Sequence, residues 1–134
     1  MVSANAAGDG AQGPACPIGA DLWCRRDGAG SFVIGLSRQA QERAGTIAHY
    51  RGPSVGRRYA RGEAAISLES EKWVGHLPLP VPGTVIETNG TLEQDPGPIN
   101  RDPYGAGWLY RMRPEDPGAL EALTASDRGD PDPR

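Results

Sequence analysis

The sequence contains no apolar run approaching the roughly 18 residues that a membrane-spanning helix requires. Its N-terminus also lacks the basic and apolar regions of a secretory signal peptide. Acidic residues outnumber basic residues by 17 to 14, so the net charge of −3 gives no general support for binding a nucleic-acid duplex. We therefore expect a cytoplasmic location, no contact with a membrane and no nucleic-acid partner.

Residue sets typical of catalysis are also lacking. The chain shows no Ser/His/Asp or Cys/His set, no phosphate-binding loop and no platform for nucleic acid. The residues that could form a zinc site lack the paired spacing of its ligands; they are Cys16, Cys24, His49 and His76. We predict that the protein binds no metal and is not an enzyme. The alternative is an enzyme that uses Cys16 or Cys24 as its nucleophile.

Long helices are excluded by the 19 glycines and 13 prolines among 134 residues. Alternating and β-branched segments instead predict short strands at 22–25, 31–36, 46–50, 64–69, 83–88 and 108–112. A short helix is expected at 38–44, capped by Ser37 and ended by Gly45. A closing helix is expected at 118–124, after an Asp-Pro start signal. The predicted fold class is therefore all-β with short helices, including a C-terminal one.

The two ends of the chain differ in composition from its body. Residues 1–15 are small and polar without periodicity, and 126–134 form a charged segment interrupted by proline. Both predict disorder, which leaves one folded domain at 16–125.

The scarcest charged residue is lysine. Of the 14 basic residues only Lys72 is a lysine, and the other 13 are arginines. A coding bias explains the scarcity of lysine, but it does not explain why position 72 keeps one. Only an amine can be deprotonated and acylated, so arginine cannot replace lysine where the side chain is a site of covalent attachment. The alternative is an ordinary surface lysine that persists by chance.

Lys72 lies between the strand at 64–69 and an extended segment at 74–81, which three prolines keep out of a helix. Residues 70–73 are therefore the expected tip of a hairpin, where a modifying enzyme can reach an exposed amine. Glycines stand on both sides of this tip, at Gly62 and Gly83, and each precedes a predicted strand. We expect Gly83 to adopt a positive φ.

The tip residues next to the lysine are Glu69, Glu71 and Trp73. The two carboxylates either present charge that a modifying enzyme reads or are ordinary solvated charges of a hairpin. Trp73 is either a contact for a group attached to Lys72 or a packed aromatic.

Three separated segments together resemble a known family. The first is the hairpin, Glu69-Ser70-Glu71-Lys72 followed by Pro82-Gly83-Thr84-Val85, which is similar to the attachment hairpin of lipoyl domains. The other two, residues 31–47 and the Asn-Arg-Asp-Pro-Tyr-Gly-Ala-Gly-Trp-Leu segment at 100–109, resemble the glycine cleavage H protein. The resemblance covers about residues 21–125, and it implies a barrel-sandwich hybrid of antiparallel sheets. It also implies that lipoic acid is joined covalently to Lys72.

Two departures from the family pattern concern the pathway. Asp21-Leu22-Trp23 stands where these proteins usually have His-Glu-Trp, and Trp73 follows the lysine where they tend to have alanine. The second departure resembles the lipoate-binding H-like proteins of heterodisulfide-reductase-like sulfur oxidation. The resemblance thus implies a lipoyl carrier for a heterodisulfide-reductase-like complex. The alternative is an H protein that carries the aminomethyl group of glycine cleavage.

The same resemblance implies the partners of the carrier. They are a lipoate-attaching ligase or transferase, the heterodisulfide-reductase-like complex or the glycine cleavage enzymes, and lipoamide dehydrogenase. A rival from another class is a binding module that keeps the fold without the lipoyl group.

The remaining candidate residues have ordinary explanations. His49 and His76 fit strand or surface positions, while Trp108 and Tyr104 fit core and turn positions. A structural disulfide between the cysteines is disfavoured in a reducing cytoplasm. Exchange of one cysteine thiol with a bound dithiolane is chemically possible.

Overall fold

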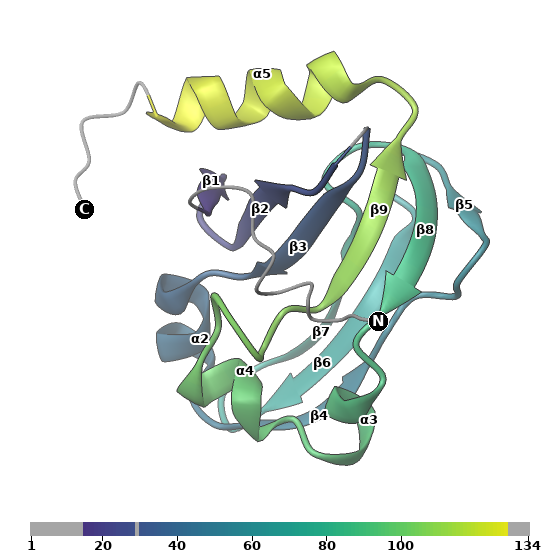
Figure 1. Ribbon diagram of the computed structural model, residues 1–134. Helices are drawn as coiled ribbons and strands as arrows, with labels where there is room; N and C mark the ends of the chain where they lie inside the picture. The colour runs from purple at the N-terminus through teal and green to yellow at the C-terminus, as the bar shows by residue number, and fades with distance from the viewer. Residues whose placement is uncertain (1–14, 29, 129–134) are drawn as a thin grey trace.

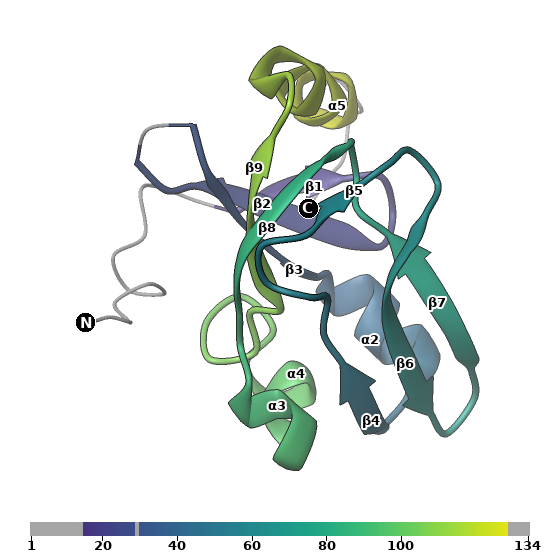
Figure 2. The same cartoon turned by 90° about the vertical axis from the view of Figure 1, so that its right-hand side faces the viewer.

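The computed structural model describes residues 15–28 and 30–128, the last four of these by their helical backbone only. Two antiparallel sheets make up this part of the chain (Figures 1 and 2). The larger sheet has the strand order β1-β2-β3-β9-β8-β5 and the smaller one the order β4-β6-β7. The predicted barrel-sandwich hybrid of antiparallel sheets with short helices is confirmed.

The strands are short, as the density of glycine and proline requires. Their bounds are β1 Cys16–Ile18, β2 Leu22–Arg26, β3 Phe32–Leu36, β4 Ile47–Arg51, β5 Arg58–Tyr59, β6 Ala64–Ser70, β7 Val74–Pro78, β8 Gly83–Thr88 and β9 Tyr110–Pro114. Strand β3 is buried along its whole length because it lies inside the larger sheet and covers the core.

The helices are α2 Arg38–Ala44, α3 Thr91–Gln94, α4 Gly97–Arg101 and α5 Pro117–Arg128. Ser37 caps α2 by accepting a hydrogen bond from the Ala40 N–H, and Gly45 ends the helix with a φ of 80°. Both signals were predicted from the sequence. Asp116 begins α5 by accepting a hydrogen bond from the Gly118 N–H at 3.0 Å. None of the helices in the described residues is long and apolar enough to span a membrane.

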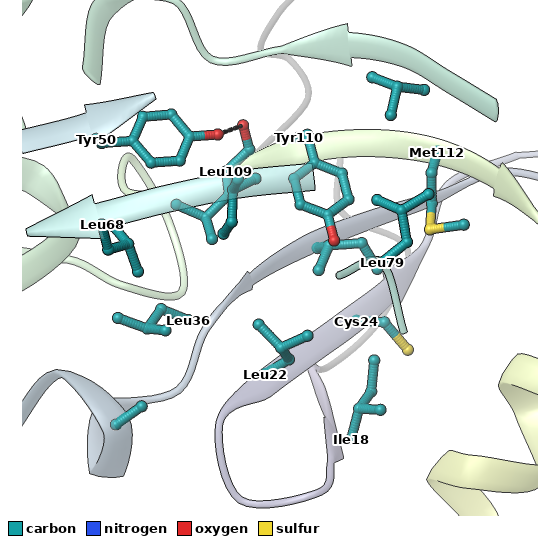
Figure 3. Packing of buried hydrophobic residues seen from close by; sticks show 14 of the residues in the cluster. Ile18, Leu22, Cys24, Leu36, Tyr50, Leu68, Leu79, Leu109, Tyr110 and Met112 are labelled. Atoms are coloured by element: carbon teal, nitrogen blue, oxygen red, sulfur yellow. Dashed lines mark hydrogen bonds between the residues drawn. The ribbon is translucent and has the colours of Figure 1, made fainter. Parts of the chain in front are cut away.

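The core lies between the two sheets and includes three buried tyrosines, Tyr50, Tyr59 and Tyr110, the first and last of which are labelled in Figure 3. The Tyr50 hydroxyl donates a 3.0 Å hydrogen bond to the Leu109 carbonyl, which satisfies both groups away from water. Burial raises the pKa of Tyr50 well above its ordinary value, and it raises the pKa of Tyr110 in the same direction. Both side chains are therefore held in the neutral form.

Several elements differ from the expectations. Strands β1 and β5 and helices α3 and α4 were not foreseen, and α5 continues to Arg128 rather than ending at 124. Strand β9 begins at Tyr110 instead of 108 because the preceding turn holds Trp108, whose N–H donates to the Gly105 carbonyl. The disorder expected at 1–15 and 126–134 concerns mostly residues outside the described ranges.

The expectation for Gly83 is wrong. Among the described residues, the glycines with positive φ are Gly19, Gly28, Gly30, Gly45, Gly56 and Gly62, and Gly83 is not one of them. Glycine is needed at position 83 because strand β9 passes so close. A Cβ there would lie 2.6 Å from the Arg113 carbonyl oxygen.

Candidate functional site

Lys72 lies at the tip of the hairpin formed by β6 and β7, and its side chain is exposed. The turn is closed by Ser70, whose N–H donates to the Trp73 carbonyl at 2.8 Å. The Ser70 hydroxyl makes two further bonds of 3.1 Å to the backbone of Trp73, one donated and one accepted. The turn backbone is therefore closed by Ser70 while the lysine side chain extends outward.

The tip is also fastened to the connection between α2 and β4 (Figure 2). The Lys72 N–H donates to the Ala44 carbonyl at 3.2 Å, and the Glu71 N–H donates to the Thr46 carbonyl at 3.1 Å. The Glu71 carboxylate in turn accepts a 3.1 Å bond from the Thr46 N–H. Glu71 thus holds the tip in place, a role that no local sequence pattern indicates.

Gly45 allows this close approach. Its φ of 80° lies in the region that side chains disfavour, and a Cβ there would lie 2.5 Å from Glu71 Oε1. Glycine at this position therefore both ends α2 and leaves room for the carboxylate that anchors the hairpin tip.

Asn100 supports the same connection from α4. Its side-chain oxygen accepts a 2.8 Å bond from the Ile47 N–H, and its amide donates a 3.0 Å bond to the Gly45 carbonyl. Asp102 then organises the following turn by accepting bonds from the Gly105 and Gly107 N–H groups at its carbonyl. The segment at 100–109 therefore supports the surface on which the lysine hairpin rests.

A cavity of about 250 Å³ opens beside Lys72. Its apolar lining comes from β3, α2 and the hairpin, namely Leu36, Ala40, Ala44, Leu68 and Leu77. Its polar lining residues besides Lys72 are Asp21 and Arg43, which form an ion pair with each other. The cavity can accommodate an apolar group and offers a carboxylate to a cationic one.

Trp73 forms a further wall of this cavity and is 40% exposed. Its indole lies over Gly75, where a Cβ would be only 2.7 Å from the ring. The glycine two residues further along β7 thus leaves space for the ring beside the lysine.

The other predicted residues do not line this cavity. Glu69 is exposed on β6, where it pairs in register with His49 on β4, and His76 is exposed on β7. Tyr104 accepts a 2.9 Å bond from the Arg38 N–H, which agrees with a turn role. Within the described ranges no cluster of His, Cys, Asp and Glu could hold a metal ion.

The sequence predicts a site at Lys72 and its neighbours, but it contains no sign of the cavity beside them. Asp21, Leu36 and Arg43 are at least 29 residues from Lys72 along the chain, so no local pattern joins them to it. The one sequence signal near the cavity is the departure from the family pattern at 21–23, which includes the lining residue Asp21.

The chain is similar to glycine cleavage H proteins in each of three comparisons. The family model described as "Glycine cleavage H-protein" matches residues 18–129. A glycine cleavage system H protein of Alkalilimnicola ehrlichii is 41% identical over 101 residues, which cover 75% of this chain and 78% of the relative. A probable glycine cleavage system H protein 2 of Saccharolobus solfataricus is 37% identical over 102 residues, which cover 76% of this chain and 69% of the relative.

A solved structure agrees with the sequence relatives. The crystal structure of a glycine cleavage system H protein from Mycobacterium marinum superposes with a TM-score of 0.70 at 31% identity. The match covers 88% of this chain and 98% of that one, so the shared fold includes nearly the whole neighbour.

Proposed function

The chain belongs to the glycine cleavage H-protein family. We propose that Lys72 is the lipoyl attachment site of the protein and that the protein serves glycine cleavage. Members of this family carry a covalently attached lipoate and are carriers rather than catalysts, and both statements apply to this chain. The attachment residue, the carried group and the enzyme partners are the content of the proposal.

The observation that supports Lys72 most strongly is its position. The only lysine of the chain lies at an exposed hairpin tip whose backbone is held by bonds to Ala44 and Thr46. A ligase or transferase that forms an amide at Nζ needs an accessible amine in a defined backbone setting, and this tip supplies both. Amide formation removes the positive charge of the side chain.

The residues around the lysine fit a lipoyl group. When bound, this group supplies a dithiolane whose sulfur chemistry holds transferred groups and electrons between enzymes. The chain itself contributes the apolar lining of Leu36, Leu68 and Leu77, which shelters an apolar ring from water. Trp73 adds a polarisable wall that suits sulfur.

The choice between pathways rests on the relatives and on Asp21. The relatives carry glycine cleavage names, so the comparisons favour the alternative stated above over sulfur oxidation, for which they give no support. A cationic aminomethyl group favours a nearby carboxylate, and this chain has Leu22 where the family pattern has glutamate. Asp21 lines the lysine cavity and offers that carboxylate.

The proposed partners follow from this role. Glycine cleavage enzymes would load and unload the arm, lipoamide dehydrogenase would reoxidise it, and a lipoate-attaching enzyme would modify Lys72. A heterodisulfide-reductase-like complex is the partner if the sulfur-oxidation role holds instead.

Glycine–bicarbonate exchange tests the proposal. The lipoylated protein is mixed with glycine decarboxylase, glycine and labelled bicarbonate, and incorporation of label into glycine is measured against an ordinary H protein. We expect exchange that requires lipoylation, so the unlipoylated chain is the matched control. A fully lipoylated protein that supports no exchange would contradict the glycine cleavage role and promote the sulfur-oxidation role.

A further inference from the structure

The two cysteines of the chain lie directly opposite each other in the sheet. Cys16 is in β1 and Cys24 is in β2, and the antiparallel register of these strands pairs their Cα atoms. The sequence alone gave no basis for this pairing, because the existence of β1 was not foreseen.

The register satisfies the geometric demands of a disulfide. Directly opposed residues of an antiparallel pair have Cα atoms about 4.5 or 5.5 Å apart, depending on the hydrogen-bonding site. Disulfides span Cα separations of about 4.4–6.8 Å, so either site is compatible with a bond. Cross-strand partners also project to the same face of the sheet, which places the two cysteine side chains next to each other.

That face is the inner one. Ile18 and Leu22 are the next opposed pair on the same face, and both are buried (Figure 3). Cys24 is only 3% exposed and its side chain lies among core residues, whereas Cys16 is half-buried at the edge of the sheet. The two sulfurs therefore differ in how easily a reagent from solution reaches them.

We propose that Cys16 and Cys24 form a reversible thiol–disulfide pair that reacts with low-molecular-weight disulfides. The Cys16 thiolate attacks the small disulfide, forms a mixed disulfide and releases one small thiolate. The Cys24 sulfur, after losing its proton, then attacks the Cys16 sulfur and releases the second small thiolate. In total the protein gives two electrons and two protons, and the small disulfide becomes two thiols.

The second step is favoured by the fold. Because Cys24 already lies opposite Cys16, its attack is intramolecular and needs no movement of the strands past each other. The resulting bond ties the edge strand β1, on which helix α5 packs, to β2 inside the larger sheet (Figure 1). This pair does not depend on Lys72 or on the function proposed for it.

The sequence permits a direct test by mass. The first Lys or Arg of the chain is Arg25, so trypsin releases both cysteines in the single peptide 1–25. The reduced protein is treated with oxidised glutathione, quenched, alkylated and digested. We expect this peptide without alkyl groups and lighter than the reduced form by two hydrogens. Cleavage by chymotrypsin at Leu22 or Trp23 should then leave the two halves joined.

Two variants test the order of reaction. Cys24→Ala should retain glutathione on Cys16, because the resolving thiol is missing. Cys16→Ala should slow modification of Cys24 by about tenfold or more, because burial limits its access. A wild-type protein that accumulates glutathione on Cys16 while Cys24 stays alkylatable, or that forms cross-linked dimers, overturns the pair. Equal reactivity of Cys24 in the Cys16→Ala variant overturns the assigned order.

Discussion

The backbone N–H of Lys72 donates a 3.2 Å hydrogen bond to the carbonyl oxygen of Ala44, the last residue of α2. This bond joins the tip of one hairpin to the end of a helix 28 residues earlier in the chain. The lysine side chain is exposed, but its backbone is part of the folded framework. A flexible arm on this side chain would therefore extend from a backbone that is held in place.

Lys72→Arg should preserve the fold and abolish lipoylation. The exposed tip buries little side chain and arginine keeps the charge, so the free energy of unfolding should change by less than about 0.5 kcal/mol. The guanidinium cannot be acylated, so intact mass after co-expression with a lipoate-attaching enzyme should show no adduct.

A matched control places a lysine elsewhere at the same cavity. The double variant Lys72→Arg, Arg43→Lys restores an amine on α2 but not at the hairpin tip. We expect it to remain unmodified, because the enzyme acts on an amine at the tip. Lipoylation of this variant would show that proximity to the cavity is sufficient.

Gly45→Ala should destabilise the protein through two effects. The positive φ costs about 1 kcal/mol for alanine, and the new Cβ collides with the Glu71 carboxylate. Gly56→Ala is the control, since Gly56 also has a positive φ of 86° but no atom within 4 Å of the added Cβ. Urea unfolding should show a larger loss for position 45, and the rate of lipoylation should fall there only. Equal losses of unfolding free energy at both positions would show that the collision with Glu71 adds nothing to the cost at Gly45.

Glu71→Ala should loosen the tip by removing the acceptor for the Thr46 N–H. A single exposed hydrogen bond of this kind contributes about 1 kcal/mol or less, so the protein stays folded while amide exchange at Thr46 becomes faster. Glu71→Gln keeps an acceptor oxygen and should behave nearly as the wild type. If both variants are lipoylated equally slowly, the charge of Glu71 matters rather than its bond. Glu69→Gln, in contrast, should leave Thr46 exchange unchanged.

Asp21→Asn tests the carboxylate at the cavity. Lipoylation should be unaffected, because the Asp21 carboxylate pairs with Arg43 and not with the backbone of the tip. Glycine–bicarbonate exchange should fall by about two- to fivefold, the effect of losing an exposed charge pair of under 1 kcal/mol. The control is Glu121→Gln on α5, which breaks the ion pair between Glu121 and Arg26 and leaves the lysine cavity unchanged. Unchanged exchange in Asp21→Asn would show that this carboxylate does not serve the carried group.

Alkaline unfolding should reflect Tyr50 and Tyr110, the two buried tyrosines whose pKa is raised. Their folded-state pKa values are raised, so their contribution to stability is present below the ordinary tyrosine pKa of about 10 and is lost as the pH rises above it. Each tyrosine should lower the free energy of unfolding by about 1.4 kcal/mol per pH unit in that range. Tyr50→Phe should reduce this slope in urea titrations at pH 10–11. It should also cost about 1 kcal/mol at pH 7, because the Leu109 carbonyl loses its donor.

The sequence predicted those parts of the fold whose signals are local. Ser37 and Gly45 mark the ends of α2 by capping chemistry, and the strand-turn-strand pattern around Lys72 marks the hairpin tip. It failed where distant segments decide the structure. Gly83 has an ordinary φ and is required by the approach of β9, and β1 exists only because it pairs with β2.

The site shows the same division. The rarity of lysine and the residues beside it point to Lys72 as the proposed attachment site, whereas no sequence signal points to the contacts that support its hairpin. Asn100 holds the α2–β4 connection from 53 residues beyond Ile47, and Asp21 reaches the cavity from the turn between β1 and β2. These contacts between distant segments depend on tertiary packing, and no local pattern in a single sequence predicts them.

A tryptic map of the natively produced protein shows whether Lys72 carries the lipoyl group. Trypsin cuts an unmodified chain after Lys72 and gives the peptides 62–72 and 73–101, but it does not cut after an acylated lysine. We predict a single peptide 62–101 that carries the mass of one lipoyl group, with fragment ions that place it on Lys72. Complete cleavage at Lys72, in protein from cells that lipoylate their other carriers, would show that Lys72 is not the attachment site.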